Sequence, residues 1–121
     1  YCTNRSWDDA MKIIKSSQVV VVPSRMESLP TTIKEAFYLN VPVIATDVGG
    51  IPELIKDNET GIVVSSENPD KLAEAVNELL SYKQKAIRLA NNGNKFAKNN
   101  MIWDIILPNT IHFYEELLAT S

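Results

Sequence analysis

The chain has 121 residues, which is enough for one ordinary domain or for a piece of one. Hydrophobic residues make up 45% and charged residues 22%, so a disordered tail is excluded. The net charge of -3 excludes a strongly basic surface, and we expect no nucleic-acid partner. The single cysteine, Cys2, cannot form an internal disulfide, and with one histidine it cannot build a Cys/His zinc cluster. A reducing, cytoplasmic location is therefore the simplest expectation.

The first half of the sequence alternates between helix and strand patterns. Ser6 followed by Asp9 is a loose capping pattern, and apolar residues at helical spacing follow it. Short runs rich in Val and Ile end at turn-forming residues, which is typical of strands buried on both faces. In chain order we predict a helix at 7–15, a strand at 19–22, a helix at 31–39, a strand at 43–46, a helix at 51–55 and a strand at 62–64. Asn40 is a plausible left-handed stop for the second helix.

The second half is helical. Asn68 is placed to cap a helix that begins at Pro69. A further helix is expected to end near Gly93. A last helical stripe starts at Trp103, and Pro108 inside it should kink or divide that helix. Both tryptophans, Trp7 and Trp103, lie on apolar stripes and are expected in the core.

The alternation of elements predicts an α/β fold with about three parallel strands and flanking helices. The strand at 43–46 should lie in the middle of the sheet. Three strands are few for such a sheet, whose usual size is about five or six. The pattern therefore resembles the C-terminal half of a Rossmann-like domain, with the neighbour of the strand at 19–22 supplied from elsewhere.

The loop at 23–30 carries the features most closely tied to chemistry. It leaves the first strand at the carboxyl edge of the sheet, where open α/β sheets bind their ligands. It then opens a helix, and free N–H groups at a helix start suit a phosphate. Glu27 lies in the loop and Glu35 on the helix, where carboxylates can accept hydrogen bonds from sugar hydroxyls. This combination predicts a nucleotide-sugar site.

Two sequence segments carry a family resemblance. PSRMESLPTTIKEAF at 23–37 and VPVIATDVGGIPE at 41–53 resemble the GT-B glycosyltransferases of family 4, also called group 1. Their signature is two glutamates separated by seven residues, here Glu27 and Glu35. Residues 58–64 and 69–73 resemble the next strand and helix of the family. The ordered match covers nearly the whole chain.

The resemblance implies a retaining transferase that uses a nucleotide-diphosphate sugar, without a metal or another cofactor. Glu27 matches the catalytic glutamate placed against the hydroxyls of the donor sugar, and Glu35 matches the one that holds the ribose. The backbone from Leu29 to Thr32 matches the loop that meets the diphosphate, so the donor-binding residues that the resemblance implies in this segment are Ser28, Leu29, Pro30, Thr31 and Thr32. Because Pro30 has no N–H, Thr31 and Thr32 would supply most of the backbone donors.

The resemblance also implies that residues 1–121 are part of a C-terminal, nucleotide-sugar-binding domain. The chain begins with Tyr1 rather than Met, as an excised fragment would. The N-terminal acceptor domain would then lie upstream of Tyr1. A glycan, lipid or small-molecule acceptor, and any peripheral membrane contact, would be bound through that domain. Biosynthesis of a cell-envelope polysaccharide is the expected setting.

Simpler interpretations remain open for several of these residues. Thr32 and Glu35 are spaced as a capping box, a purely structural role. Gly49 and Gly50 form either a donor-facing loop or only a turn that needs positive φ. Arg25 either neutralises phosphate or lies on the surface, and the surface is favoured. For the whole chain, the alternative to a glycosyltransferase is a non-catalytic module that binds a nucleotide sugar or has a regulatory role.

Overall fold

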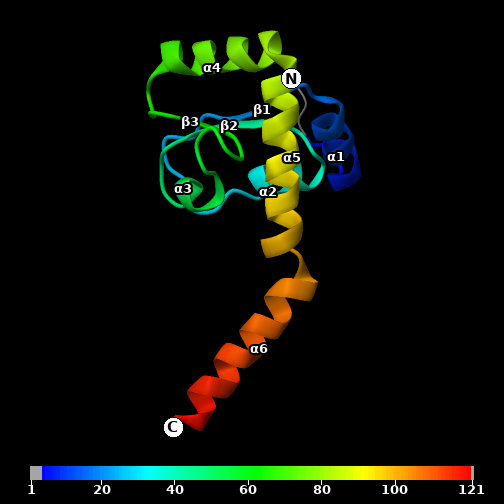
Figure 1. Cartoon of the computed structure of the whole chain (residues 1–121), viewed down its shortest axis with the longest axis vertical. Coiled ribbons are helices and arrows are strands. Elements are labelled where there is room, and N and C mark those ends of the chain that lie inside the picture. The colour runs from blue at the N-terminus through cyan, green and yellow to red at the C-terminus, as the bar shows by residue number, and fades with distance from the viewer. Residues whose placement is uncertain (1–3, 121) are drawn as a thin grey trace.

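Three short parallel strands form the centre of the molecule (Figure 1). The computed structural model describes residues 4–120, so Cys2 lies outside the described part. The sheet has the order β1-β2-β3, and its strands are β1 (Val20–Val22), β2 (Val43–Thr46) and β3 (Ile62–Val64). The predicted α/β class and the central position of β2 are therefore confirmed.

Helices cover both faces of this sheet. They are α1 (Trp7–Ser16), α2 (Thr31–Tyr38), α3 (Ile51–Leu54), α4 (Pro69–Ser81), α5 (Lys83–Asn100) and α6 (Trp103–Ala119). Figure 1 shows α4 on one side of the sheet, and α2 and α3 on the other. α5 passes from α4 to α2, with which it makes its most extensive contact, and α1 packs beside α2.

The sheet is buried on both faces because successive side chains of a strand point to opposite sides. All four residues of β2 are buried. On one face, Val43 and Ala45 belong to a core that includes Phe37 of α2. On the other face, Ile44 belongs to a second core that includes Leu79 of α4. The apolar runs that predict the strands thus reflect burial from two sides.

α5 is longer than the sequence predicts, because Gly93 lies inside it and not at its end. The fully buried ring of Phe37 lies where a side chain at position 93 would stand. A Cβ atom on Gly93 would be 2.6 Å from Cδ1 of Phe37. Phe96, on the next turn of α5, packs edge-on against the same ring. Gly93 therefore permits the close approach of α2 and α5, and the predicted helix end near it is wrong.

Three local signals at helix ends are confirmed. The hydroxyl of Ser6 accepts a hydrogen bond from the backbone N–H of Asp9 at the start of α1 (3.2 Å). The side chain of Asn68 accepts one from Lys71 N–H at the start of α4 (3.0 Å). Asn40, just after α2, has a φ of 60°, the left-handed conformation that Asn tolerates better than most residues.

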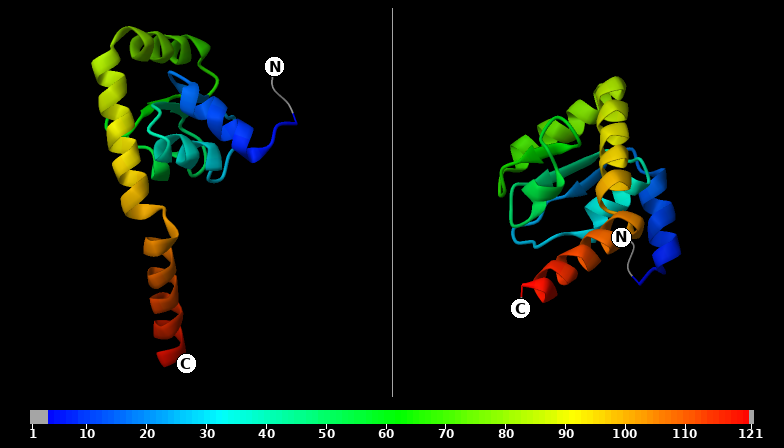
Figure 2. Two further views of the ribbon diagram at one scale, coloured as in Figure 1. Left: turned by 90° about the vertical axis from the view of Figure 1, so that its right-hand side faces the viewer. Right: turned by 60° about the horizontal axis from the view of Figure 1, so that its bottom comes forward.

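The two tryptophans lie on the surface, contrary to the prediction that they are in the core. Trp7 is 67% exposed and Trp103 is 76% exposed. An apolar stripe indicates which face of a helix is hydrophobic, but no described segment covers these stripes. α6 has no buried residue and extends away from the rest of the molecule in every view (Figures 1 and 2). Pro108 does not divide α6, which runs without a break from Trp103 to Ala119.

Within residues 4–120, no helix combines the length and the apolar character needed to cross a membrane.

Candidate functional site

The loop at 23–30 is tied to the carboxyl edge of the sheet from two directions. The hydroxyl of Thr46, at the end of β2, donates a hydrogen bond of 2.6 Å to the carbonyl of Ser24. Thr46 is 4% exposed, so this bond satisfies a buried polar group. The backbone N–H of Gly50 donates to the carbonyl of Ser28 (2.8 Å). The loop therefore has a defined position at the edge where ligands of parallel sheets bind.

Gly49 and Gly50 pack closely against the backbone of this loop, at Glu27 and Ser28. Gly49 has a φ of 54°, and a Cβ atom there would lie 1.6 Å from the carbonyl oxygen of Glu27. Gly50 has a φ of -85°, yet its Cβ atom would lie 2.3 Å from the carbonyl oxygen of Ser28. The positive-φ interpretation is thus confirmed for Gly49, whereas Gly50 is required for close approach. Contact of this glycine pair with a donor stays a prediction.

Glu27 is half-buried and is oriented by its own loop. Its Oε1 atom accepts a hydrogen bond of 2.9 Å from the N–H of Ser28. The neighbouring side chains of Met26, Ser28 and Leu29 are exposed. Arg25 lies on the surface, where its Nε atom is 3.5 Å from a carboxylate oxygen of Glu67. The surface position of Arg25 is therefore confirmed, whereas its contact with a phosphate stays a prediction.

The start of α2 is uncapped. Pro30 precedes the first helical residue, and no side chain caps the helix. The backbone N–H groups of Thr31 and Thr32 have no protein acceptor among the described residues. These two groups are the donors predicted to meet a diphosphate, and the helix start adds a partial positive charge.

The predicted capping box between Thr32 and Glu35 is wrong. α2 begins at Thr31, so Thr32 is already inside the helix and cannot act as its cap. Pro30 is the last extended residue, with a ψ of 126°, and the helix starts directly after it. Glu35 instead accepts a hydrogen bond at its Oε1 atom from the indole Nε1–H of Trp7 (3.4 Å). This contact is absent from the sequence prediction, because the two residues are far apart in the chain.

Glu35 and Trp7 lie on the wall of a mainly apolar groove of about 610 Å³. Its other walls include Met11 of α1, Tyr38 of α2 and Met101 after α5. The groove thus lies among α1, α2 and the segment that follows α5, and no residue of the loop at 23–30 lines it.

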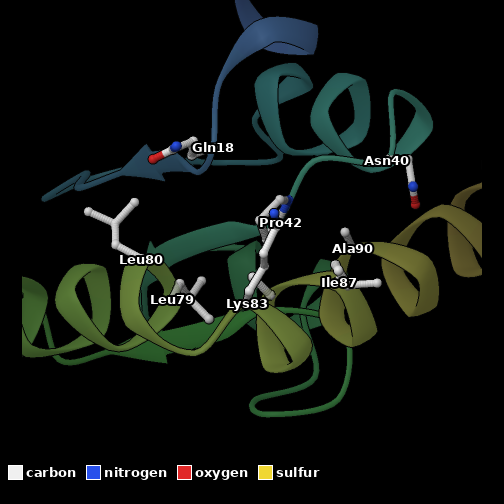
Figure 3. Close-up of a pocket in the computed structure, with 9 residues that line it drawn as sticks. Gln18, Asn40, Pro42, Leu79, Leu80, Lys83, Ile87 and Ala90 are labelled. Atoms are coloured by element: carbon white, nitrogen blue, oxygen red, sulfur yellow. The ribbon is translucent and has the colours of Figure 1, made fainter.

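A second pocket lies at the opposite edge of the sheet (Figure 3). It has a volume of about 330 Å³ and is lined by Gln18 and Pro42, which precede β1 and β2, and by residues of α4 and α5 such as Leu79 and Ile87. Because it lies at the amino ends of the strands, it contains none of the predicted site residues. No group of His, Cys, Asp and Glu within residues 4–120 is arranged to hold a metal ion.

The hydroxyl of Thr46 was missed by the sequence analysis, and its role in the loop can be tested. We expect Thr46→Val to lower the free energy of unfolding by about 1–2 kcal/mol, because the carbonyl of Ser24 loses its donor. Amide exchange should also become faster at Ser24 and Ser28. Thr60→Val is the matched control, since buried Thr60 accepts from Lys56 N–H (2.9 Å) away from this loop. Equal exchange in the loop of both variants would contradict the prediction.

The loop after β1 at the carboxyl edge thus carries the carboxylate of Glu27 directly before a helix start with unpaired N–H groups, and the carboxylate of Glu35 lies further along the same helix. An anionic ligand that also carries hydroxyl groups fits this combination. A parallel sheet flanked by helices, with this edge, is the architecture of GT-B glycosyltransferases. The chain belongs to the family described as Glycosyl transferases group 1, which it matches over residues 2–96.

Individual relatives agree with this assignment. The chain is 32% identical over 113 residues to an uncharacterized glycosyltransferase of Methanocaldococcus jannaschii, covering 93% of this chain and 32% of the relative. It is 34% identical over 88 residues to a GDP-mannose-dependent alpha-(1-6)-phosphatidylinositol monomannoside mannosyltransferase of Mycobacterium tuberculosis, covering 73% of this chain and 23% of the relative. Sucrose-phosphate synthase from Thermosynechococcus elongatus superposes with a TM-score of 0.83 at 30% identity, covering 90% of this chain and 27% of that protein. The chain therefore spans about a third or less of the length of these proteins.

Proposed function

We propose that the chain is the donor-binding part of a retaining family 4 glycosyltransferase, which moves a sugar from a nucleotide-diphosphate sugar to an acceptor without a metal or another cofactor. The observation that carries the proposal is the uncapped start of α2 directly after the loop of Glu27. Membership of the group 1 glycosyltransferases supports the same assignment.

The proposed roles follow the chemistry of each group. The N–H groups of Thr31 and Thr32, with the helix dipole, stabilise the negative charge of the diphosphate before and during its departure. Ser28 and Leu29 place the loop backbone against the same group. Glu27 is held by the N–H of Ser28 through Oε1, which leaves its Oε2 atom to accept hydrogen bonds from the donor sugar. Glu35 accepts hydrogen bonds from the ribose hydroxyls.

The relatives support a nucleotide-linked donor, since one of them is named as GDP-mannose-dependent. The chain spans about a third or less of the lengths of these relatives. We propose that the remaining part of a complete protein supplies the acceptor domain. That domain would bind a glycan, a lipid or a small molecule in a cytoplasmic pathway of cell-envelope polysaccharide synthesis.

The donor is found first by saturation-transfer NMR of the complete protein against GDP-mannose, UDP-glucose and other nucleotide sugars. With the selected donor, we expect Glu35→Gln to weaken binding about five- to thirtyfold, because a charged acceptor forms stronger hydrogen bonds with hydroxyls than a neutral one. Its melting temperature should stay close to that of the wild type, because Glu35 takes no part in a cap. Calorimetric titration and thermal melts measure both quantities.

Glu74→Gln is the control for this experiment. Glu74 lies exposed on α4, where it pairs with Lys71, so the same substitution there should leave donor affinity unchanged. If Glu35→Gln binds the donor as tightly as the wild type does, the ribose role of Glu35 is wrong. If no nucleotide sugar binds the complete wild-type protein, the proposed function itself is wrong.

A further inference from the structure

The contact between Trp7 and Glu35 joins two helices that are separate in sequence. The indole Nε1–H of Trp7 donates to Oε1 of Glu35 at 3.4 Å. α1 has no buried residue, and the ring of Trp7 is mostly exposed. Packing in the described core therefore does not account for a tryptophan at this position. Its one polar atom, however, has an acceptor on a residue of the proposed donor site.

The position of each partner is set by its own helix. The cap of Ser6 on Asp9 N–H fixes the start of α1 immediately before Trp7, and Ile14 packs α1 against the core. Glu35 follows from the start of α2 after Pro30. The hydrogen bond therefore depends on the relative placement of α1 and α2, which pack against each other.

One carboxylate oxygen of Glu35 is left for a ligand. Trp7 has a single N–H donor and occupies only Oε1. Oε2 accepts no hydrogen bond from any residue in the range 4–120. A glutamate side chain has many rotamers, and a ligand that binds it must otherwise restrict them. A partner that already holds one oxygen lowers this cost.

We propose that Trp7 is a positioning residue for donor binding: its indole N–H holds Oε1 of Glu35, so that Oε2 is presented to the ribose hydroxyls of a nucleotide sugar. This inference rests on the proposed function, because it takes Glu35 as the ribose ligand. Trp7 itself touches no reacting atom and acts only through Glu35. Its removal lowers donor affinity and leaves the rate of sugar transfer by the saturated enzyme unchanged.

The test uses Trp7→Phe in the complete protein, which keeps an aromatic ring and removes the N–H. We expect donor affinity to fall about two- to fivefold, the effect of one exposed hydrogen bond. We also expect KM for the donor to rise, kcat to stay the same, and the melting temperature to stay within the error. Trp103→Phe is the matched control, since Trp103 lines the same groove without a hydrogen bond to Glu35, and it should bind the donor as the wild type does.

A double-mutant cycle separates positioning from direct contact. If Trp7 acts through Glu35, the double variant Trp7→Phe/Glu35→Gln should lose no more affinity than the weaker-binding of the two single variants. Additive losses would mean that Trp7 contacts the donor itself, which overturns the proposal. An unchanged affinity for Trp7→Phe beside a weakened Glu35→Gln also overturns it, while the proposed function stands. If both single variants bind normally, the ribose role of Glu35 fails as well.

The contact can also be measured without any donor. The chain contains two tryptophans and therefore gives two indole N–H signals in a ¹H–¹⁵N spectrum. Glu35→Ala removes the acceptor, so it should shift the signal of Trp7 and leave that of Trp103 in place, whereas Glu74→Ala should shift neither. An unmoved Trp7 signal would show that the hydrogen bond is absent in solution.

Discussion

Gly49→Ala is expected to weaken donor binding about ten- to a hundredfold, because displacing Glu27 removes a charge-assisted hydrogen bond to the donor. The new Cβ atom would stand 1.6 Å from the carbonyl oxygen of Glu27, so the loop must move. A backbone atom cannot rotate out of the way as a side chain can. A φ of 54° adds a conformational cost of about 1–2 kcal/mol for a residue other than glycine. Calorimetric titration of the complete protein measures the affinity, and a thermal melt measures the stability.

Gly93→Ala is the matched control for this experiment. It is also a glycine-to-alanine substitution, and its new Cβ atom would lie 2.6 Å from Cδ1 of Phe37, away from the loop of Glu27. We expect it to lower the free energy of unfolding by about 1–2 kcal/mol, the difference between overpacking and the gain in helix propensity. Its donor affinity should be that of the wild type. Tight donor binding by Gly49→Ala would show that the loop tolerates displacement, and would contradict the prediction.

Phe37→Ala should lower the free energy of unfolding by about 3–5 kcal/mol, the usual effect of removing a buried phenylalanine ring. The ring is fully buried and contacts Gly93 and Phe96 across the contact between α2 and α5. Since small domains are stable by about 5–15 kcal/mol, this single change removes a large part of the total. Urea denaturation at constant temperature measures it.

The same experiment can be extended to the pair of Phe37 and Gly93. In the Phe37→Ala background the clash disappears, so Gly93→Ala should become neutral or stabilise by up to about 1 kcal/mol through helix propensity. In the wild-type background, Gly93→Ala should instead lower the free energy of unfolding. If the effects of Phe37→Ala and Gly93→Ala on the free energy of unfolding are strictly additive, the Phe37 ring is not the reason that position 93 requires glycine.

The strands could be predicted almost to the residue. The runs at 43–46 and 62–64 are β-branched or apolar throughout and end at turn-forming residues. The local sequence is therefore enough to predict the length and the burial of these strands. The run at 19–22 begins one residue later in the structure, at Val20. Helix caps at Ser6 and Asn68 were equally accessible, because a cap and its partner lie within three residues of each other.

The sequence-based predictions fail where the role of a residue depends on a contact with a residue that is distant in sequence. Gly93 resembles a helix stop, but position 93 requires glycine because the ring of Phe37, more than fifty residues away in the chain, packs against it. Thr32 and Glu35 have the spacing of a capping box, but α2 already begins at Thr31, and Glu35 pairs with the distant Trp7. Trp7 and Trp103 belong to apolar stripes, and a stripe does not reveal whether another segment covers it.

The candidate site was predictable as a set of residues but not as an arrangement. The motif at 23–37 identifies Glu27, Glu35 and the helix start; Glu27 lies in the loop before α2, and Glu35 lies within α2 beside Trp7. The supports of the loop come from elsewhere: Thr46 holds Ser24, and Gly49 lies behind Glu27. A buried threonine at the end of an apolar strand was the available signal, because such a hydroxyl must find a partner.

The strand order β1-β2-β3 has a consequence for how the chain folds. Every strand pairs with its neighbour in sequence, as Val20 pairs with Val43 and Ile44 with Ile62, so each pairing closes a loop of about twenty residues. Short closures of this kind favour fast folding, because little chain entropy is lost before a contact forms. Each strand–helix unit can also join the sheet as it leaves the ribosome, without waiting for distant sequence. We therefore expect β1 to pair with β2 before β2 pairs with β3 during synthesis.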